Sequence, residues 1–259
     1  MSFIGDVAPY FLPCYVFLVS HLIYYYGNGN LFWPLFVAYC VNFPYHFASK
    51  WGAVETNLDK ISEEVFRNDK RFNLPLYLFI LCDFLTWIWC LCVVSGVYPT
   101  MFENADEIFR DRICGSYGGF ALFVFVWGYM AGVNGLAGHE LIHRREPLNK
   151  AIGMFTFTKV LYSHFLLEHN SGHHRNVATP EDSATAREGE NFYSFTIRSV
   201  VDGHLNTWHR EVNRIKMKYD DKATNFNLVV ENRITWFTCL HLALLAGIYS
   251  VFGAKAVIF

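Results

Sequence analysis

Residues 115–144 read GSYGGFALFVFVWGYMAGVNGLAGHELIHR. Residues 115–136 are almost all apolar or small, and about 20 such residues are enough to cross the hydrocarbon core of a bilayer as a helix. Two histidines four residues apart, His139 and His143, follow directly at the end of this run. The stretch therefore predicts a membrane-spanning helix that carries two candidate metal ligands where it leaves the membrane.

Apolar runs of similar length recur along the chain, and 53% of its 259 residues are hydrophobic. Repeated runs of this length are typical of membrane helices rather than of strands. The sequence predicts an all-α, polytopic membrane helical bundle of about five spans, folded as a single membrane domain over residues 1–259. The predicted spans lie near residues 9–26, 31–48, 75–97, 115–136 and 235–253.

Lysine and arginine are distributed unevenly along the chain. Loops 49–74 and 137–234 hold 18 of the 21 basic residues, whereas 98–114 holds two beside four acids. By the positive-inside rule, the two basic loops face the cytoplasm or an organelle matrix. We expect 137–234 to form a polar cap on that side. The mitochondrial inner membrane and the endoplasmic reticulum fit equally well, and a net charge of −2 gives no indication of a nucleic-acid partner.

A second histidine cluster, EHNSGHH at residues 168–174, follows 30 residues after the first. It offers three imidazoles, from His169, His173 and His174, over little more than one helical turn. Metal–nitrogen bonds are about 2 Å long, so the two clusters can share a metal only on one side of the membrane. We therefore expect residues 151–167, although apolar, to form a buried or interfacial helix that does not cross.

Five imidazoles on one side of a membrane indicate a transition-metal site, because neutral imidazole suits iron and zinc. The candidate ligands are His139, His143, His169, His173 and His174. Glu140 and Glu168 adjoin them as candidate supporting carboxylates, and no catalytic residue is assigned. His-Glu-x-x-His at 139–143 is also the zincin pattern, with the glutamate as general base, so an intramembrane zinc peptidase is an alternative.

The run at 139–144, HELIHR, resembles the first histidine box of the membrane alkane monooxygenase family, within the desaturase and hydroxylase superfamily. Residues 168–190, EHNSGHHRNVATPEDSATAREGE, resemble its second box over more than 20 residues, with Ser183 where the family pattern has proline. Since the upstream hydrophobic pattern also fits, we expect the resemblance to cover almost the whole chain. It implies a non-haem diiron hydroxylase of alkanes or fatty acyl chains, with rubredoxin or ferredoxin as electron donor and the five histidines as iron ligands.

The family pattern continues with a returning span and two more motifs, N-Y-x-x-H-Y-G and L-Q-R-H-S-D-H-H, and this sequence contains neither. We therefore expect no ion, or a single iron or zinc ion. The expected function is that of a non-catalytic structural or lipid-binding subunit, in contact with the bilayer and other membrane subunits. The alternative is an active diiron monooxygenase whose missing ligands come from a partner chain or from His204 and His209. Whether the chain is an enzyme stays open at this point.

Two other sets of polar or reactive residues have structural interpretations. Asp83 lies inside the third predicted span, where a carboxylate is costly unless it is paired, so we expect a structural contact. The seven cysteines lie in or beside apolar segments at no zinc-finger or redox spacing. We expect them to be buried, reduced thiols rather than a disulfide framework.

Overall fold

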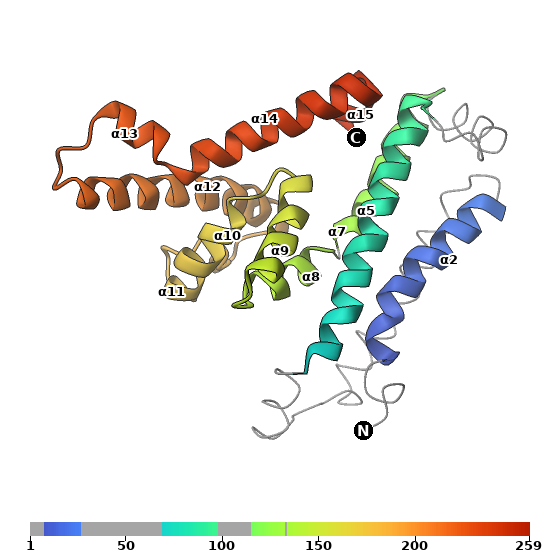
Figure 1. Ribbon diagram of the computed structural model, residues 1–259, viewed down its shortest axis with the longest axis horizontal. Coiled ribbons are helices and arrows are strands. Elements are labelled where there is room, and N and C mark those ends of the chain that lie inside the picture. The colour runs from blue at the N-terminus through green and yellow to red at the C-terminus, as the bar shows by residue number, and fades with distance from the viewer. Residues whose placement is uncertain (1–7, 27–68, 98–114, 133) are drawn as a thin grey trace. The chain divides into compact units, whose positions relative to one another are not determined.

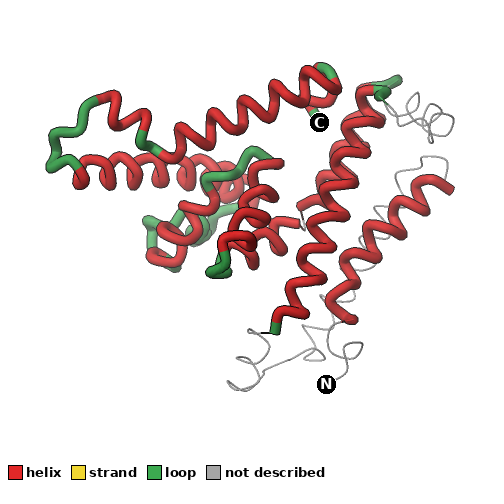
Figure 2. Tube along the Cα trace, in the orientation of Figure 1, coloured by secondary structure: helices red, strands yellow, loops and turns green. Residues whose placement is uncertain are grey.

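The computed structural model describes residues 8–26, 69–97, 115–132 and 134–259 (Figure 1). Within these ranges every regular element is a helix, in agreement with the expected all-α class (Figure 2). The predicted span near 31–48 lies outside the described residues, as do most of loop 49–74 and the whole of 98–114. The chain divides into two compact units, which are described separately: residues 1–137 with 248–259, and residues 138–247.

The helices of the first unit follow three of the predicted spans. In chain order they are η1, α2, η2, α5, α7, the first turn of α8 and, after α14, the short α15. Their bounds are Ala8–Phe11 (η1), Leu12–Tyr26 (α2), Lys70–Phe72 (η2), Asn73–Ser95 (α5), Tyr117–Gly132 (α7), Asn134–Ile142 (α8) and Ala254–Ile258 (α15).

The core of the first unit is aromatic. His21 of α2, Trp89 of α5 and Trp127 of α7 meet with ring centroids 4.7–5.1 Å apart. Tyr24 and Phe123 extend the same cluster. Large rings in edge-to-face contact bury much apolar area and favour fixed mutual angles, so this cluster ties three helices together.

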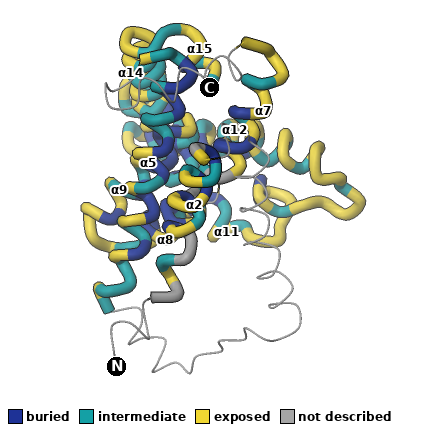
Figure 3. Tube along the Cα trace, turned by 90° about the vertical axis from the view of Figure 1, so that its right-hand side faces the viewer, coloured by how far each residue is buried: buried dark blue, intermediate teal, exposed yellow. Residues whose placement is uncertain are grey.

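Two described helices, Lys70–Ser95 and Arg233–Phe252, are long and apolar enough to cross a membrane, and Cys14–Tyr24 and Tyr117–Tyr129 are shorter apolar helices. On α5 the leucines at positions 74, 78, 81 and 85 form an exposed stripe along one side of the helix, as expected of a surface that faces lipid (Figure 3). These features agree with a membrane protein, while the number of five spans stays a prediction.

The polar and reactive residues expected to be structural lie within or beside these apolar helices. Asp83 is 2% exposed inside α5. The cysteines of the described residues are free thiols, in agreement with the expected absence of a disulfide framework, although not all of them are buried. They are Cys14, Cys82, Cys90, Cys92 and Cys239.

The second unit contains the end of α8, then α9, the short elements α10, η4 and α11, the 27-residue α12, α13 and most of α14. Their bounds are Pro147–Lys159 (α9), Phe165–Glu168 (α10), His169–His173 (η4), His174–Asn176 (α11), Phe192–Lys218 (α12), Asn225–Val230 (α13) and Arg233–Phe252 (α14). In Figure 1 the chain runs out along α12, turns through α13 and returns along α14.

Local sequence signals explain where these helices start. Pro147 occupies the first turn of α9, where its missing N–H costs no hydrogen bond. Asn191 caps α12 by accepting from the backbone N–H of Ser194. Thr224 and Asn227 form a reciprocal capping box at α13. Each cap satisfies backbone donors that the helix itself leaves free.

The helices α8 and α9 cross at two glycines, and the backbones come into direct contact. A β-carbon on Gly153 would lie 2.7 Å from the carbonyl oxygen of Gly138 and 2.9 Å from Cγ2 of Ile142. A β-carbon on Gly138 would lie 2.9 Å from Cγ2 of Thr156. Only glycine fits at such a crossing. The crossing therefore fixes the position of the next residue of α8, His139, relative to α9.

A buried carboxylate holds the start of α14 against α12. Glu211 is 3% exposed and accepts hydrogen bonds from the Arg233 side chain at 2.6 and 3.0 Å and from the Arg214 side chain at 3.0 and 3.2 Å. Burial by itself raises the pKa of Glu211, but the two arginines outweigh burial and lower the pKa to about 2. Glu211 is therefore ionised and paired at neutral pH.

Gly153→Ala is expected to destabilise the protein by roughly 1–3 kcal/mol, because its methyl group collides with backbone and forces α8 and α9 apart. Thermal unfolding of the detergent-solubilised full chain measures the effect. Gly247→Ala on α14 is the matched control. Apart from its chain neighbours and the backbone of its own helix, no atom of the described residues lies within 4 Å of its added β-carbon, and alanine is the better helix former. Equal melting temperatures for Gly153→Ala and wild type would contradict the close crossing.

Glu211→Gln is expected to lower stability at neutral pH by roughly 1–3 kcal/mol through loss of the ionic hydrogen bonds. The folded-state pKa of Glu211 is depressed from 4.5 to about 2, so its contribution is present above the unfolded-state pKa and is lost as pH falls between those values. The difference in the free energy of unfolding between wild type and Glu211→Gln should therefore become smaller as pH falls from about 6 to about 3. Glu188→Gln, at an exposed loop position, is the control, and a pH-independent gap would rule out this origin.

Candidate metal centre

Four histidine side chains from the two sequence motifs converge on one point. The Nε2 atom of His169 lies 2.7 Å from that of His139, 3.0 Å from that of His143 and 3.1 Å from that of His174. The Nε2 atoms of His139 and His143 are 3.1 Å apart, and those of His143 and His174 are 3.5 Å apart. We call these four residues the histidine quartet.

Hydrogen bonds alone do not account for this packing of nitrogens. A neutral imidazole nitrogen either carries one hydrogen or offers one lone pair, so three mutually close Nε2 atoms leave at least one pair with like groups facing each other. A metal ion accepts a lone pair from every one of them. With metal–nitrogen bonds of about 2.0–2.1 Å, ligand nitrogens at right-angled to tetrahedral positions are about 2.9–3.4 Å apart. The Nε2 atoms of His139, His143 and His169, at 2.7–3.1 Å from one another, come close to this range, so these three residues form a set that a common ion could join. His174 lies beside this set, 3.1 Å from His169.

Electrostatics keep the quartet in the form that binds metal. Burial, followed by the neighbouring imidazoles, lowers the pKa of His169 to about 3. Burial is also the largest cause that lowers the pKa of His139 and of His143. These three imidazoles are therefore neutral at physiological pH, with lone pairs available to a cation.

Two local structures bring the quartet together. His139 and His143 lie one α-helical turn apart at the end of α8, as the four-residue spacing predicts. His169 and His174 are five apart, and in an α-helix they would point about 140° away from each other. Here the chain forms a π-helical turn, η4, in which the backbone N–H of His174 donates to the carbonyl oxygen of His169. This i→i+5 turn stacks residue 174 almost over residue 169.

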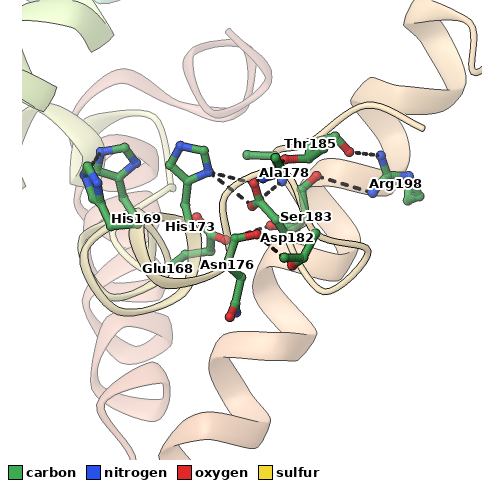
Figure 4. Close-up of polar contacts among 12 residues, drawn as sticks. Glu168, His169, His173, Asn176, Ala178, Asp182, Ser183, Thr185 and Arg198 are labelled. Atoms are coloured by element: carbon green, nitrogen blue, oxygen red, sulfur yellow. Dashed lines mark hydrogen bonds and ion pairs between the residues drawn. The ribbon is translucent and has the colours of Figure 1, made fainter. Parts of the chain in front are cut away.

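His173, the fifth candidate ligand, is held by a carboxylate. Its Nδ1–H donates to Asp182 at 2.9 Å, and the Asp182 side chain is fully buried (Figure 4). Asp182 also accepts from the hydroxyl of Thr185 and from the backbone N–H of Ala184. Burial raises the pKa of Asp182, and these donors together outweigh burial and lower it. A carboxylate behind an imidazole fixes its tautomer and leaves its Nε2 free to bind a metal.

The loop that supplies Asp182 is itself fastened to α12. Arg198 donates to the carbonyl oxygens of Ser183 and Thr185 and forms an ion pair with Glu190 at 2.6 Å (Figure 4). The sequence alone predicted no role for Asp182 or Arg198. The length of the family-like run at 168–190 was a signal for Asp182, which lies inside it, whereas Arg198 lies outside that run.

The two candidate supporting glutamates occupy different surroundings. Glu168 is 4% exposed and accepts a 2.7 Å hydrogen bond from the Ser183 hydroxyl, behind the quartet. Glu140 is exposed and pairs with Arg144 one turn along. With Glu140 engaged by Arg144 and His139 and His143 joined by two further imidazoles, the geometry lends no support to the zinc peptidase alternative.

The other histidines of the second unit lie apart from the quartet. His204 contacts the ring of His164 edge-on, with centroids 4.8 Å apart. His209 is exposed on α12. His241 of α14 is hydrogen-bonded to the Ser163 hydroxyl at 2.8 Å. Neither His204 nor His209, the two suggested substitute ligands, contacts the quartet.

The model of the fatty acid desaturase family matches residues 116–259, which is more than half of the chain and includes every residue of the quartet. The chain belongs to the fatty acid desaturase family. The family match begins at residue 116, so the expected resemblance over almost the whole chain is not supported for the first 115 residues.

Curated relatives place the chain near the alkane monooxygenases within this family. It is 36% identical to alkane 1-monooxygenase of Ectopseudomonas oleovorans and 37% identical to that of Pseudomonas putida, in each case over 130 residues, 49% of this chain. Alkane 1-monooxygenase 2 of Alcanivorax borkumensis is 28% identical over 164 residues. The matched part spans 31%, 31% and 41% of these relatives, respectively.

If His173 binds the ion beside the quartet, Asp182→Asn should weaken metal binding by about 10–100-fold, the usual effect of losing a carboxylate that orients a ligand imidazole. The neutral amide no longer favours the Nδ1–H tautomer of His173. Isothermal titration of the chelator-washed full chain with Zn²⁺ measures the change, with Asp220→Asn, at an exposed turn, as control. An unchanged affinity would show that His173 takes no part in binding.

Proposed function

We propose that this chain is an alkane-monooxygenase-like integral membrane protein whose histidine quartet holds a transition-metal ion. The observation that carries the proposal is the approach of four Nε2 atoms to 2.7–3.5 Å. The neutral state of His139, His143 and His169 supports it. Imidazole donors suit both iron and zinc, and the family resemblance favours iron.

Each part of the centre then has a defined task. The quartet binds the ion, Asp182 fixes the tautomer of His173, and Glu168 lies buried next to His169, where it accepts a hydrogen bond from Ser183. Iron held by imidazoles supplies one-electron redox chemistry with dioxygen. Because His139 follows directly after the apolar run 115–136, the proposal puts this centre near the membrane surface, where a hydrocarbon chain would reach it from the bilayer.

The number of ions separates two roles. Within the described residues, His139, His143 and His169 form one set of nitrogens close enough to share an ion, with His174 beside it, which supports a single ion. A single ion favours a structural or lipid-binding role within a larger membrane assembly, because the diiron chemistry implied by the resemblance needs a second metal.

An active hydroxylase of alkanes or fatty acyl chains is the second candidate. The identity of 36–37% to two alkane 1-monooxygenases over 130 residues favours it. In this case the missing ligands come from a partner chain or from His204 and His209, and rubredoxin or ferredoxin supplies electrons. The membrane that contains the protein would be the mitochondrial inner membrane or that of the endoplasmic reticulum.

Metal analysis of the purified full chain, washed with chelator and reloaded with Fe²⁺, is expected to give one ion per chain. His139→Ala and His169→Ala should each reduce the affinity by more than the roughly 10–100-fold typical of outer partners, because they remove direct ligands. His209→Ala, which alters an exposed histidine of α12, should leave binding unchanged. Failure of the wild-type chain to bind any ion would refute the proposal.

The same preparation decides between the two roles. Two irons per chain, together with octanol formation from octane in the presence of a ferredoxin and its reductase, would establish the hydroxylase. One ion and no product under the same conditions would support the structural or lipid-binding role.

A further inference from the structure

The π-helical turn η4 needs support from outside its own backbone. Such turns have poorer hydrogen-bond geometry than α-helix and are rare except at functional sites. Within η4 and just before it, side chains help: the Ser171 hydroxyl donates to the carbonyl oxygen of Leu167, and Asn170 donates to that of Leu166. These contacts are local to the turn, so they do not fix it relative to α12.

Arg210 of α12 supplies a contact from outside the turn. A β-carbon built on Gly172, in the middle of η4, would lie 2.5–2.8 Å from NH2, Cζ and NH1 of Arg210. Three atoms of one planar group at nearly equal distance mean that the guanidinium lies across the glycine. Gly172 is thus the position that admits Arg210 to the turn.

The Arg210 guanidinium is held in place by a hydrogen bond, although its partial burial is energetically unfavourable. Its NH2 donates to the Thr207 hydroxyl at 2.8 Å, and Thr207 in turn donates to the carbonyl oxygen of Gly203. Its Nε is buried and has no hydrogen-bond partner among the described residues. Burial lowers the pKa of Arg210, and the negative charge of Glu168 raises it. A half-buried arginine with an unsatisfied donor is tolerated where its charge has a partner.

Glu168 is that partner, and it directly precedes His169. Its carboxylate is buried and accepts from Ser183, and its Cγ would lie 3.4 Å from a β-carbon on Gly203. Arg210 therefore acts on the turn at two places: its guanidinium lies across Gly172, within η4, and it interacts electrostatically with Glu168, which directly precedes the turn.

We propose that Arg210 is a positioning residue of the metal centre: by lying across Gly172 and facing Glu168, it holds η4 in the π-helical form that aims His169 and His174 at a common ion. This inference rests on the proposed metal-binding function. Without Arg210, the turn is free to relax toward α-helix, and His174 swings away from the quartet. An α-helical turn is the more favourable backbone conformation. The hydrogen bonds of Ser171 and Asn170 are local to the turn, so Arg210 supplies the contact from α12 that opposes this relaxation.

A double-mutant cycle on the full chain tests the proposal with Co²⁺ as the only added ligand. Arg210→Ala and Gly172→Ala should each weaken Co²⁺ binding by about 10–100-fold and shift its visible absorption band toward that of a site with fewer nitrogen ligands. In the double variant the added methyl group no longer meets a guanidinium. Its affinity should therefore lie within about twofold of Arg210→Ala alone.

Conservative replacements separate charge from packing. Arg210→Lys keeps the positive charge facing Glu168 and should recover part of the affinity, whereas Arg210→Met keeps only the length and should not. Lys216→Ala, an exposed position on the same helix, is the control and should match wild type. These two replacements also serve if Arg210→Ala fails to fold, and thermal unfolding of each metal-free variant identifies such a failure.

The outcomes distinguish this inference from the proposed function. If wild type binds no Co²⁺, the metal centre itself is refuted. If wild type binds and every Arg210 variant binds equally well with an unchanged absorption band, the centre stands and the role of Arg210 is refuted. Additive losses in the double variant, or equal affinities for the lysine and methionine variants, would also overturn it, because they would show that Arg210 acts neither through Gly172 nor through its charge.

Discussion

The second unit depends on one constraint, which is that four imidazole nitrogens approach one another to about 3 Å without repelling. Uncompensated, such an approach is unfavourable, because the nitrogens crowd lone pairs together and displace water from polar groups. The surrounding structure therefore has to hold the rings in place before any ion arrives. Several of its less usual features serve this purpose, including a glycine crossing, a π-helical turn and a loop fastened by an arginine.

The glycine crossing and the π-helical turn position different histidines of the metal centre. The contact of Gly138 with Gly153 sets how close α8 comes to α9, and so where His139 lies. The π turn sets the direction of His174 relative to His169. A methyl group added at the crossing would move a ring nitrogen farther than a metal–nitrogen bond tolerates. A change of η4 from a π-helical to an α-helical turn would have the same effect. Precision at this centre comes from backbone packing.

Support for the histidines comes mainly from α12, a helix whose sequence shows no metal-binding pattern. Arg198 fastens the loop that carries Asp182, Arg210 lies against η4, and Glu211 anchors the start of α14. All three interactions join residues far apart in sequence through charged hydrogen bonds or close packing in partly buried surroundings. Interactions of this kind are stronger away from bulk water, where competing solvent is excluded.

The sequence by itself determined the helical class, the ends of α5 and α14 to within about two residues, the resemblance to alkane monooxygenases and the four histidines of the quartet. These follow from local properties: apolar length, the four-residue spacing of His139 and His143, and a long motif. It did not determine the π turn, since an α-helix is the default for EHNSGHH, nor the roles of Asp182, Arg198 and Arg210. Those roles depend on which segments pack together, and contacts between distant residues leave no periodic trace in a single sequence. Only the tertiary structure decided them.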